Sequence, residues 1–385
     1  MLKYEIKKYI LKPSIIISLS VFLLINLVKV LEIYYYTGGG RNVLFGGKDR
    51  TVIGEEILYE KYCGKITDEK IEMLKAELKT AEAKLKEYGI IEEPIEDSYT
   101  GYPYGDVNVT KNIIKAYEYA ILYSDYSNSL SEKALSNAEF FRGINDYDYR
   151  KNLLLADCYK NRAVDSFCRT RAYSAIFDYK FSTILSMLII ILAISPIVAK
   201  EKSIGYDRLI VSTGKGTRVM IAKIITASLF TIISSFILFA SDVIYYQQIY
   251  GFDGLNLPIY AIEAFKNCPF ELTLIGAVFM TYLLRLAFLL TFSFMVVFIS
   301  ALSKNEIASM AVSMGTAFLL VILSEHIPSE ISPTSLIGTS DMFSMVKLTD
   351  VLGFPVFSFV VALFVVAVLS VIFITFAIRR GRKCC

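Results

Sequence analysis

Residues Ala199–Arg218 read AKEKSIGYDRLIVSTGKGTR and separate two long apolar runs, Phe181–Val198 and Val219–Ala240. At 1.5 Å per helical residue, each run is about long enough to cross a hydrocarbon core roughly 30 Å thick. Basic side chains outnumber acidic ones in the stretch, and the positive-inside rule therefore places this short loop in the cytoplasm. Such a loop could transmit the movement of a cytoplasmic partner protein to the two spans that it joins.

The composition agrees with a membrane protein, because hydrophobic residues make up 55% of the chain and charged residues only 20%. The apolar runs that can span a bilayer are Ser14–Ile33, Phe181–Val198, Val219–Ile244, part of Leu272–Leu302, Ile307–Leu323 and Val356–Ala377. No small-residue cleavage site follows the first run, so we interpret it as a retained anchor. The sequence predicts an all-α, polytopic membrane protein with six transmembrane helices. A net charge of +3 is too small and scattered to indicate a nucleic-acid partner.

Basic residues in the short connections orient the spans. Several precede the first span and follow the sixth, and Lys304 lies between the fourth and fifth, whereas the connections at 248–270 and 326–352 together hold five acidic residues and only two lysines. Both termini are therefore expected in the cytoplasm, as an even number of spans requires. Residues 1–34 would form a cytoplasmic amphipathic helix and the first span. Residues 35–179 would form an extracellular helical domain, and residues 180–385 the remaining spans with the cytoplasmic loop 199–218.

The fourth apolar run holds a charged residue, Arg285, near its middle. The run is too long for one perpendicular helix, so either it is tilted or only Leu286–Leu302 spans the bilayer. An arginine at mid-depth costs at least about 2.5 kcal/mol and should face protein or water. Arg285 then marks a translocation path or a dimer contact, or it pairs with a neighbouring helix or extends to the interface.

Three helical patterns occupy the large domain between the first two spans. One is expected at 67–89, with Thr67 as its N-cap, and a second at about 110–141. A third starts near Tyr147 and meets no Pro or Gly before Pro196, so it is expected to continue unbroken into the second span. The domain would be a helical stalk on the membrane that handles cargo or serves as a spacer without a ligand site.

Several kinds of chemistry lack the residues they need. The chain has one histidine, His326, which excludes a histidine pair or a three-histidine metal site, and no metal site is expected. Residues 214–217, GKGT, resemble a fragment of a phosphate-binding loop, but the required G-x-x-x-x-G-K-[ST] spacing is missing and no strand precedes it. The sequence therefore predicts that this chain is not an enzyme and holds no cofactor.

The cysteines divide by compartment. Cys63, Cys158 and Cys168 belong to the expected extracellular domain, where a disulfide can persist. Cys158 and Cys168 are about 15 Å apart on the expected third helix, too far to bond while it stays straight. Cys63 pairs with one of them, or all three are free thiols. Cys384 and Cys385 follow basic residues at a membrane edge, where they are acylated or remain reduced.

The loop also carries a sequence pattern, E-K-x-x-G-x-x-x-L-x-x-x-T, followed by an arginine and a lysine. Its members are Glu201, Lys202, Gly205, Leu209, Thr213, Arg218 and Lys223. The pattern resembles that of the ABC type-2 permeases, the membrane subunits of ATP-binding-cassette exporters in the bacterial cell membrane. Gly214 stands where that family usually has a proline.

The N-terminal segment is similar to the interfacial elbow helix of the same family. Leu2, Ile6, Tyr9 and Ile10 share an apolar face, and the other face carries Lys3, Lys7, Lys8 and Lys12. Such a helix lies against membrane lipid. The large domain between the first two spans departs from small members of the family and is similar to that of its sodium-exporter and peptide-exporter subfamilies.

The resemblance implies a partnership. Two copies, or this chain and a paralogue, would form the translocation pathway, and two separate cytoplasmic ATPase subunits would bind ATP and magnesium. The loop would be the coupling helix, with Glu201 and Arg208 as docking contacts, Gly205 allowing a tight bend and Leu209 as apolar anchor. Alternatively, these residues merely cap two spans and face lipid headgroups. The cargo is a peptide, a lipid-like compound or an ion.

Two other classes of protein fit parts of the sequence. A receptor or scaffold would bind a partner through the extracellular stalk without transport and would not depend on an ATPase. An intramembrane enzyme is disfavoured, because the chain lacks histidine pairs and nucleophile motifs. Four-span permeases of the macrolide-exporter type also carry a large domain after their first span, but the additional pair of spans argues against them.

Overall fold

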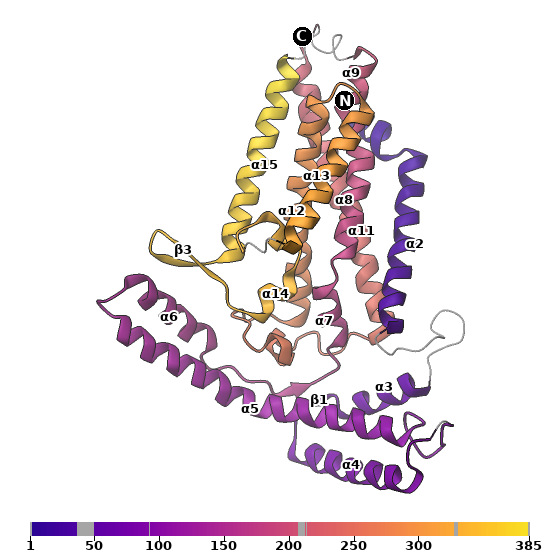
Figure 1. Ribbon diagram of the computed structural model, residues 1–385, viewed down its shortest axis with the longest axis vertical. Helices are drawn as coiled ribbons and strands as arrows, with labels where there is room; N and C mark the ends of the chain where they lie inside the picture. The colour runs from indigo at the N-terminus through magenta and orange to yellow at the C-terminus, as the bar shows by residue number, and fades with distance from the viewer. Residues whose placement is uncertain are drawn as a thin grey trace.

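The computed structural model describes residues 2–36, 50–91, 93–206, 212, 214–326 and 330–383. Within these residues, six helices are long and apolar enough to cross a membrane, which confirms the expected polytopic, mainly helical fold. They are α2 (Pro13–Tyr36), α8 with α9 (Phe181–Ile194 and Pro196–Ser203), α11 (Gly216–Tyr250), α12 (Leu274–Leu302), α13 (Glu306–His326) and α15 (Ser358–Lys383). Figure 1 shows a bundle with both chain termini at one end, called here the termini end, and the helical domain of residues 50–178 at the other, the domain end.

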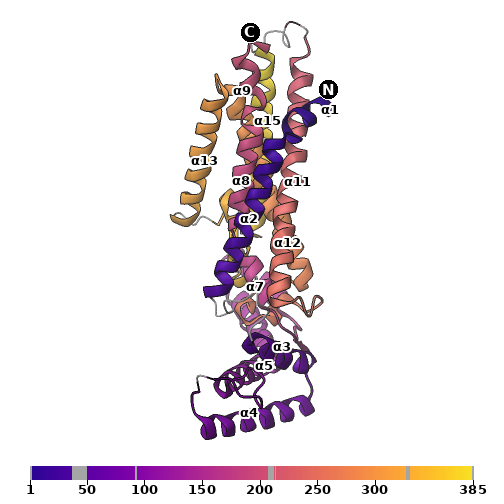
Figure 2. The same cartoon turned by 90° about the vertical axis from the view of Figure 1, so that its right-hand side faces the viewer.

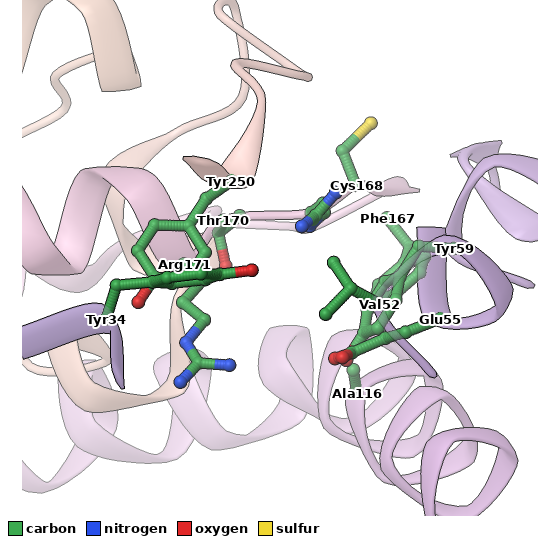
Figure 3. A pocket seen from close by; sticks show the side chains of 11 residues that line it. Tyr34, Val52, Glu55, Tyr59, Ala116, Phe167, Cys168, Thr170, Arg171 and Tyr250 are labelled. Atoms are coloured by element: carbon green, nitrogen blue, oxygen red, sulfur yellow. The ribbon is translucent and has the colours of Figure 1, made fainter. Parts of the chain in front are cut away.

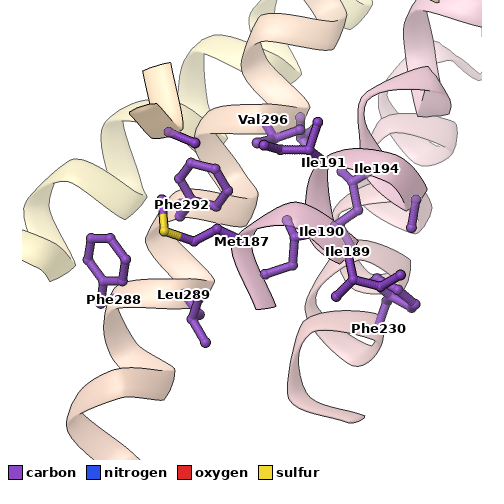
Figure 4. Packing of buried hydrophobic residues seen from close by; sticks show 14 of the residues in the cluster. Met187, Ile189, Ile190, Ile191, Ile194, Phe230, Phe288, Leu289, Phe292 and Val296 are labelled. Carbon is purple, nitrogen blue, oxygen red and sulfur yellow. The ribbon is translucent and has the colours of Figure 1, made fainter. Parts of the chain in front are cut away.

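Helix α8 lies at the centre of the bundle. It buries 78% of its most apolar window, against 56% for α11 and α12 and between 11% and 17% for α2, α13 and α15. Figure 4 shows α8 between α11 and α12, with Met187 against Phe292 and Ile189 beside Phe230. The least buried helices expose apolar side chains such as Phe364 (70% exposed), which is the surface expected of helices that contact lipid.

Helix α12 is unbroken from Leu274 to Leu302, and the Thr273 side chain caps its first turn by accepting from the Gly276 amide. The long fourth run is therefore one continuous helix over these residues. Figure 2 shows α13 standing at the side of the bundle, with α2 along another face. Helix α13 contacts α12, α9 and α8.

The helical domain consists of short elements around one long helix. They are α3 (Arg50–Tyr62), β1 (Gly64–Lys65), α4 (Asp68–Tyr88), α5 (Pro103–Phe141), α6 (Asp146–Tyr159), β2 (Ser166–Phe167) and α7 (Arg171–Asp178). As predicted, Thr67 caps α4 by accepting from the Lys70 amide, and Gly89 ends it with φ +68°. Helix α4 packs on α5, where Leu74 joins Tyr117 and Phe167 in one apolar cluster.

The prediction of a long third helix that continues into the second span is wrong. Helix α6 ends at Tyr159, and Asn161 then adopts a left-handed conformation with φ +56°. Asparagine tolerates this conformation better than most residues, so the chain turns without a glycine or proline. Strand β2 and helix α7 follow, and α7 ends at Asp178, before α8 begins. The domain is therefore not continuous with the second span through one helix.

The domain instead rests on the connection between α11 and α12, which includes η2 (Ile259–Ala261) and η3 (Glu263–Phe265). Arg162 is 1% exposed and donates to the carbonyls of Cys268 (2.6 Å) and Pro269 (2.8 Å). Tyrosine hydroxyls of α5 and α6 donate to the same connection; they belong to Tyr119, Tyr123, Tyr126 and Tyr159. These bonds replace the expected continuous helix as the link between domain and bundle.

A second contact joins the domain to the segment before α15. That segment holds η4 (Pro333–Leu336), α14 (Thr339–Ser344) and the hairpin of β3 (Leu348–Val351) with β4 (Phe354–Phe357). Leu352 and Gly353 both have positive φ, as a tight two-residue hairpin turn requires. Arg150 of α6 stacks 4.1 Å from the Phe354 ring.

Replacing Arg162 with methionine should weaken the attachment of the domain to the α11–α12 connection, because the carbonyls of Cys268 and Pro269 would lose a charged donor. We expect the free energy of unfolding to fall by about 3 kcal/mol and amide hydrogen exchange across residues 259–270 to become faster. Lys160→Met removes a charge from an exposed neighbour and is the matched control. Equal exchange rates in the Arg162→Met variant and the unmodified chain would contradict the assigned role of Arg162.

Candidate functional site

The N-terminal segment lies against the termini end of the bundle. It forms α1 (Leu2–Glu5) and a wide turn of π-helix, η1 (Ile6–Ile10), before α2 begins at Pro13. Tyr9 is 2% exposed and joins the main apolar core, where Ile10 packs beside it. Lys7 is exposed, and the side chain of Lys3 lies outside the described residues. The amphipathic segment predicted from the sequence is thus packed against protein along its apolar face.

Four charged side chains from three distant segments meet beneath this turn, and we call Glu5, Lys8, Glu201 and Lys223 the charge cluster. The Lys223 ammonium lies 2.9 Å from Glu201 and 3.3 Å from Glu5, and the Lys8 ammonium lies 2.6 Å from Glu201. Lys223 also donates to the Ile197 carbonyl at 2.5 Å. The cluster therefore joins the N-terminal segment to α9 and α11.

Burial makes these ion pairs consequential. Lys223 is 2% exposed, Glu5 4% and Glu201 6%. Two carboxylates face two ammonium groups, so the cluster is formally neutral. Removing charges from water is expensive, and a buried pair is tolerated only when its partners and hydrogen bonds are complete. The cluster therefore imposes one arrangement on the N-terminal segment rather than serving as a surface ion pair.

Tyr9 lies between the charge cluster and the main apolar core. Its hydroxyl lies 3.4 Å from a Glu201 oxygen, and the ammonium groups of Lys8, Lys12 and Lys223 lie 4.9 to 5.1 Å from its ring. Burial, followed by the charges of Glu201 and Glu5, raises the pKa of the Tyr9 hydroxyl far above its ordinary value. Tyr9 therefore stays neutral and acts as a hydrogen-bond donor and a cation-binding ring.

Helices α8 and α9 meet at a break stabilised from outside. Pro196 cannot donate a backbone hydrogen bond, so the helix ladder is interrupted there. The Ser195 carbonyl accepts from Ser300 (2.7 Å) and Ser309 (2.8 Å), while the Ser300 hydroxyl oxygen accepts from the amides of Val198 and Ala199. Serines of α12 and α13 thus supply the bonds that α8 and α9 lack, and they fix the direction of α9.

The loop after α9 begins with a bend. Gly205 has φ +74°, a left-handed conformation that agrees with the expected tight turn. Lys202 donates to the Ala301 carbonyl, and Arg218 is exposed in the first turn of α11. Arg208, Leu209 and Thr213 lie outside the described residues, so their assigned contacts stay predictions.

The structure changes which loop residues are candidates for contact with a partner. Glu201 was expected to contact an ATPase, but its carboxylate is buried in the charge cluster, which favours a positioning role. Ile204 and Tyr206 are 63% and 57% exposed beside the bend and are the better described candidates for a partner contact. Sequence reasoning missed both, although apolar residues within a basic loop were a usable signal.

Arg285 faces protein, which is one of the two surroundings, protein or water, expected from the sequence. It is 3% exposed and donates to the carbonyls of Ile176 (3.2 Å), Phe177 (3.3 Å) and Ile337 (3.3 Å). Ile176 and Phe177 lie in the last turn of α7, so the guanidinium caps that helix and complements its dipole. This geometry favours a structural pairing over a contact with cargo.

A buried polar group near Arg285 joins α2 to α11. Asn26 is fully buried; its amide donates to Asp242 (2.6 Å) and Ser241 (3.2 Å), and its carbonyl oxygen accepts from the Tyr179 hydroxyl (2.7 Å). Asp242 is 1% exposed. These bonds tie the first span to the third and to the start of the second.

Two of the cavities among the described residues lie where the bundle meets the helical domain or the segment before α15. The larger, about 620 Å³, has a lining that includes Lys180, Lys347, Glu330 and Asp341 together with Phe270, Met342, Met345 and Phe359. The smaller, about 210 Å³, is shown in Figure 3, where Arg171, Glu55 and Tyr59 border it. In the described part of the chain, no three His, Cys, Asp or Glu side chains are grouped as metal ligands.

Comparison with known protein-family models, curated proteins and solved structures finds no match to this chain. The case for its function therefore rests on the residues and contacts described above.

Proposed function

We propose that this chain is the membrane permease subunit of an ABC exporter, driven by a separate cytoplasmic ATPase. The observation that carries the proposal is the charge cluster. It fixes the N-terminal segment to the last turn of α9, where the basic loop 199–218 begins. A loop that receives force from a partner requires rigid support, and buried ion pairs provide it.

Movement of the loop would pass into the bundle through contacts already described. Helix α9 is bonded to α12 by Ser300, and the α8–α9 break is bonded to α13 by Ser309. At the opposite end, Arg285 of α12 holds α7, the last helix of the domain. Closure of an ATPase dimer on ATP would therefore move the bundle and the domain together as one body.

The partners follow from this mechanism. The pathway would form between this chain and a second copy or a paralogue, while ATP and magnesium would be bound by the ATPase. Both termini and the loop would lie in the cytoplasm and the helical domain outside the cell. The larger cavity combines two lysines and two carboxylates with aromatic and methionine side chains, a lining that suits an amphipathic peptide or lipid-like cargo better than an ion.

A receptor or scaffold is the second candidate. The observation that favours it is the hydrogen-bonded seat of the domain on residues 259–270, which would present a fixed surface to a partner without any ATPase. Dependence on ATP distinguishes the two functions.

The test is reconstitution in liposomes with a separately expressed ABC ATPase subunit from the same organism. The chain alone should hydrolyse no ATP, and the pair should show hydrolysis that responds to the permease. Ile204→Asp, Tyr206→Asp and Leu209→Asp should each reduce binding of the ATPase at least tenfold, because each places a carboxylate in an apolar contact. Ile90→Asp, on an 89% exposed residue of the domain, is the control.

The proposal fails if the three loop variants bind the ATPase as tightly as the control does. It also fails if the purified chain hydrolyses ATP without a partner. Normal partner binding by the domain in the absence of any ATPase would instead support the receptor.

A further inference from the structure

Strands β1 and β2 bring two cysteines together from opposite ends of the helical domain. The antiparallel register pairs Gly64 with Phe167 and Lys65 with Ser166. The next opposed pair in this register is Cys63 and Cys168, and their sulfur atoms lie 2.6 Å apart as thiols. Directly opposed residues of an antiparallel pair have Cα atoms about 4.5–5.5 Å apart, within the range that a disulfide spans.

We propose that Cys63 and Cys168 form a disulfide in the mature protein. The proposal rests on the proposed function in one respect, because it requires the helical domain to lie outside the cytoplasm, where disulfides persist. In the reaction, the two thiols lose two protons and two electrons and form one S–S bond. A thiol–disulfide oxidoreductase accepts the electrons and protons as its own disulfide becomes a dithiol.

The surroundings of the pair fit a structural bridge. Cys63 is half-buried and Cys168 is buried. Burial, followed by the hydrogen bond to Cys168, raises the pKa of the Cys63 thiol to about 12, the direction expected of a buried structural cysteine rather than of a reactive one.

The disulfide would connect two parts of the domain that lie 105 residues apart in the sequence. Cys63 follows α3, whereas Cys168 comes three residues before α7, the helix that Arg285 holds on the bundle. Figure 3 shows the Cys168 sulfur pointing away from the smaller cavity, so oxidation leaves that cavity unobstructed. A nearby ion pair of Arg169 with Glu56 (2.9 Å) joins the same two segments.

Thiol counting tests the proposal directly. In a variant with Cys158, Cys268, Cys384 and Cys385 replaced by alanine, only the proposed pair remains. The protein is denatured and labelled with a maleimide polymer, with or without prior reduction and removal of the reductant. We expect no free thiol before reduction and two after it, whereas the further change Cys63→Ser should leave one free thiol throughout.

A second arm separates pairing from compartment: the purified protein is treated with copper phenanthroline. Two free thiols as isolated, with full bridging after oxidation, would overturn the mature disulfide and also contradict the extracellular placement in the proposed function. Two free thiols in both arms would overturn the disulfide alone, because the strand pairing itself would then be wrong.

Thermal unfolding gives an independent readout. Cys63→Ala and Cys168→Ala should each lower the unfolding midpoint by about 10 °C, because each opens the same long loop. The double variant should lose no more than either single variant, since both remove one bond. Additive losses from the two single changes would overturn the proposal.

Discussion

Replacing Lys223 with methionine should lower the free energy of unfolding by about 3–5 kcal/mol and release the N-terminal segment. Lys223 is 2% exposed and contacts both Glu5 and Glu201, so its loss leaves two buried carboxylates with Lys8 as their remaining cation. The measurement is the thermal unfolding midpoint of the purified protein, together with the rate of trypsin cleavage at the N-terminal lysines.

Lys7→Met is the matched control, because Lys7 belongs to the same segment but is exposed. It should leave the midpoint unchanged, and likewise the rate of trypsin cleavage at the N-terminal lysines that remain. Adding Glu5→Gln to Lys223→Met should restore part of the loss, since it removes one unpaired carboxylate. A Lys223→Met protein as stable as the Lys7→Met protein would show that the charge cluster does not hold the segment.

Replacing Arg285 with glutamine should lower the stability of the bundle by about 3 kcal/mol and separate the motion of the helical domain from that of α12. Three carbonyls, those of Ile176, Phe177 and Ile337, would lose their charged donor in a buried place. Hydrogen exchange across α7 and the thermal midpoint measure the effect. In the reconstituted exporter, transport should fall while ATPase binding stays unchanged.

Arg285→Lys tests the geometry of this contact. Lysine keeps the charge but offers a single point rather than a planar fork, so it should recover only part of the stability. Arg142→Gln is the control, because Arg142 is exposed and its ion pair with Glu139 lies on the surface of the domain. If Arg285→Gln and Arg142→Gln have equal midpoints and equal exchange across α7, Arg285 does not cap that helix.

Local signals in the sequence were sufficient for several features. The spans follow from continuous hydropathy, which a bilayer requires of every segment that crosses it. The beginning and end of α4 follow from Thr67 and Gly89, because a cap bonds to backbone only a few residues away. The bend at Gly205 follows from the conformational freedom of glycine. The cap and bend signals act within one or two helical turns, and the hydropathy signal acts within a single helix.

Other features were decided only by tertiary structure. No glycine or proline near Asn161 marks the end of a helix; Asn161 tolerates the turn, and Arg162 stabilises it by reaching carbonyls 106 and 107 residues away. Glu201 is positioned by Lys8, which precedes it by 193 residues, and Arg285 by carbonyls 52 to 109 residues away. Burial and charge pairing depend on which segments meet in space, so the sequence located the loop, whereas only the folded chain showed which of its residues are supports and which are exposed.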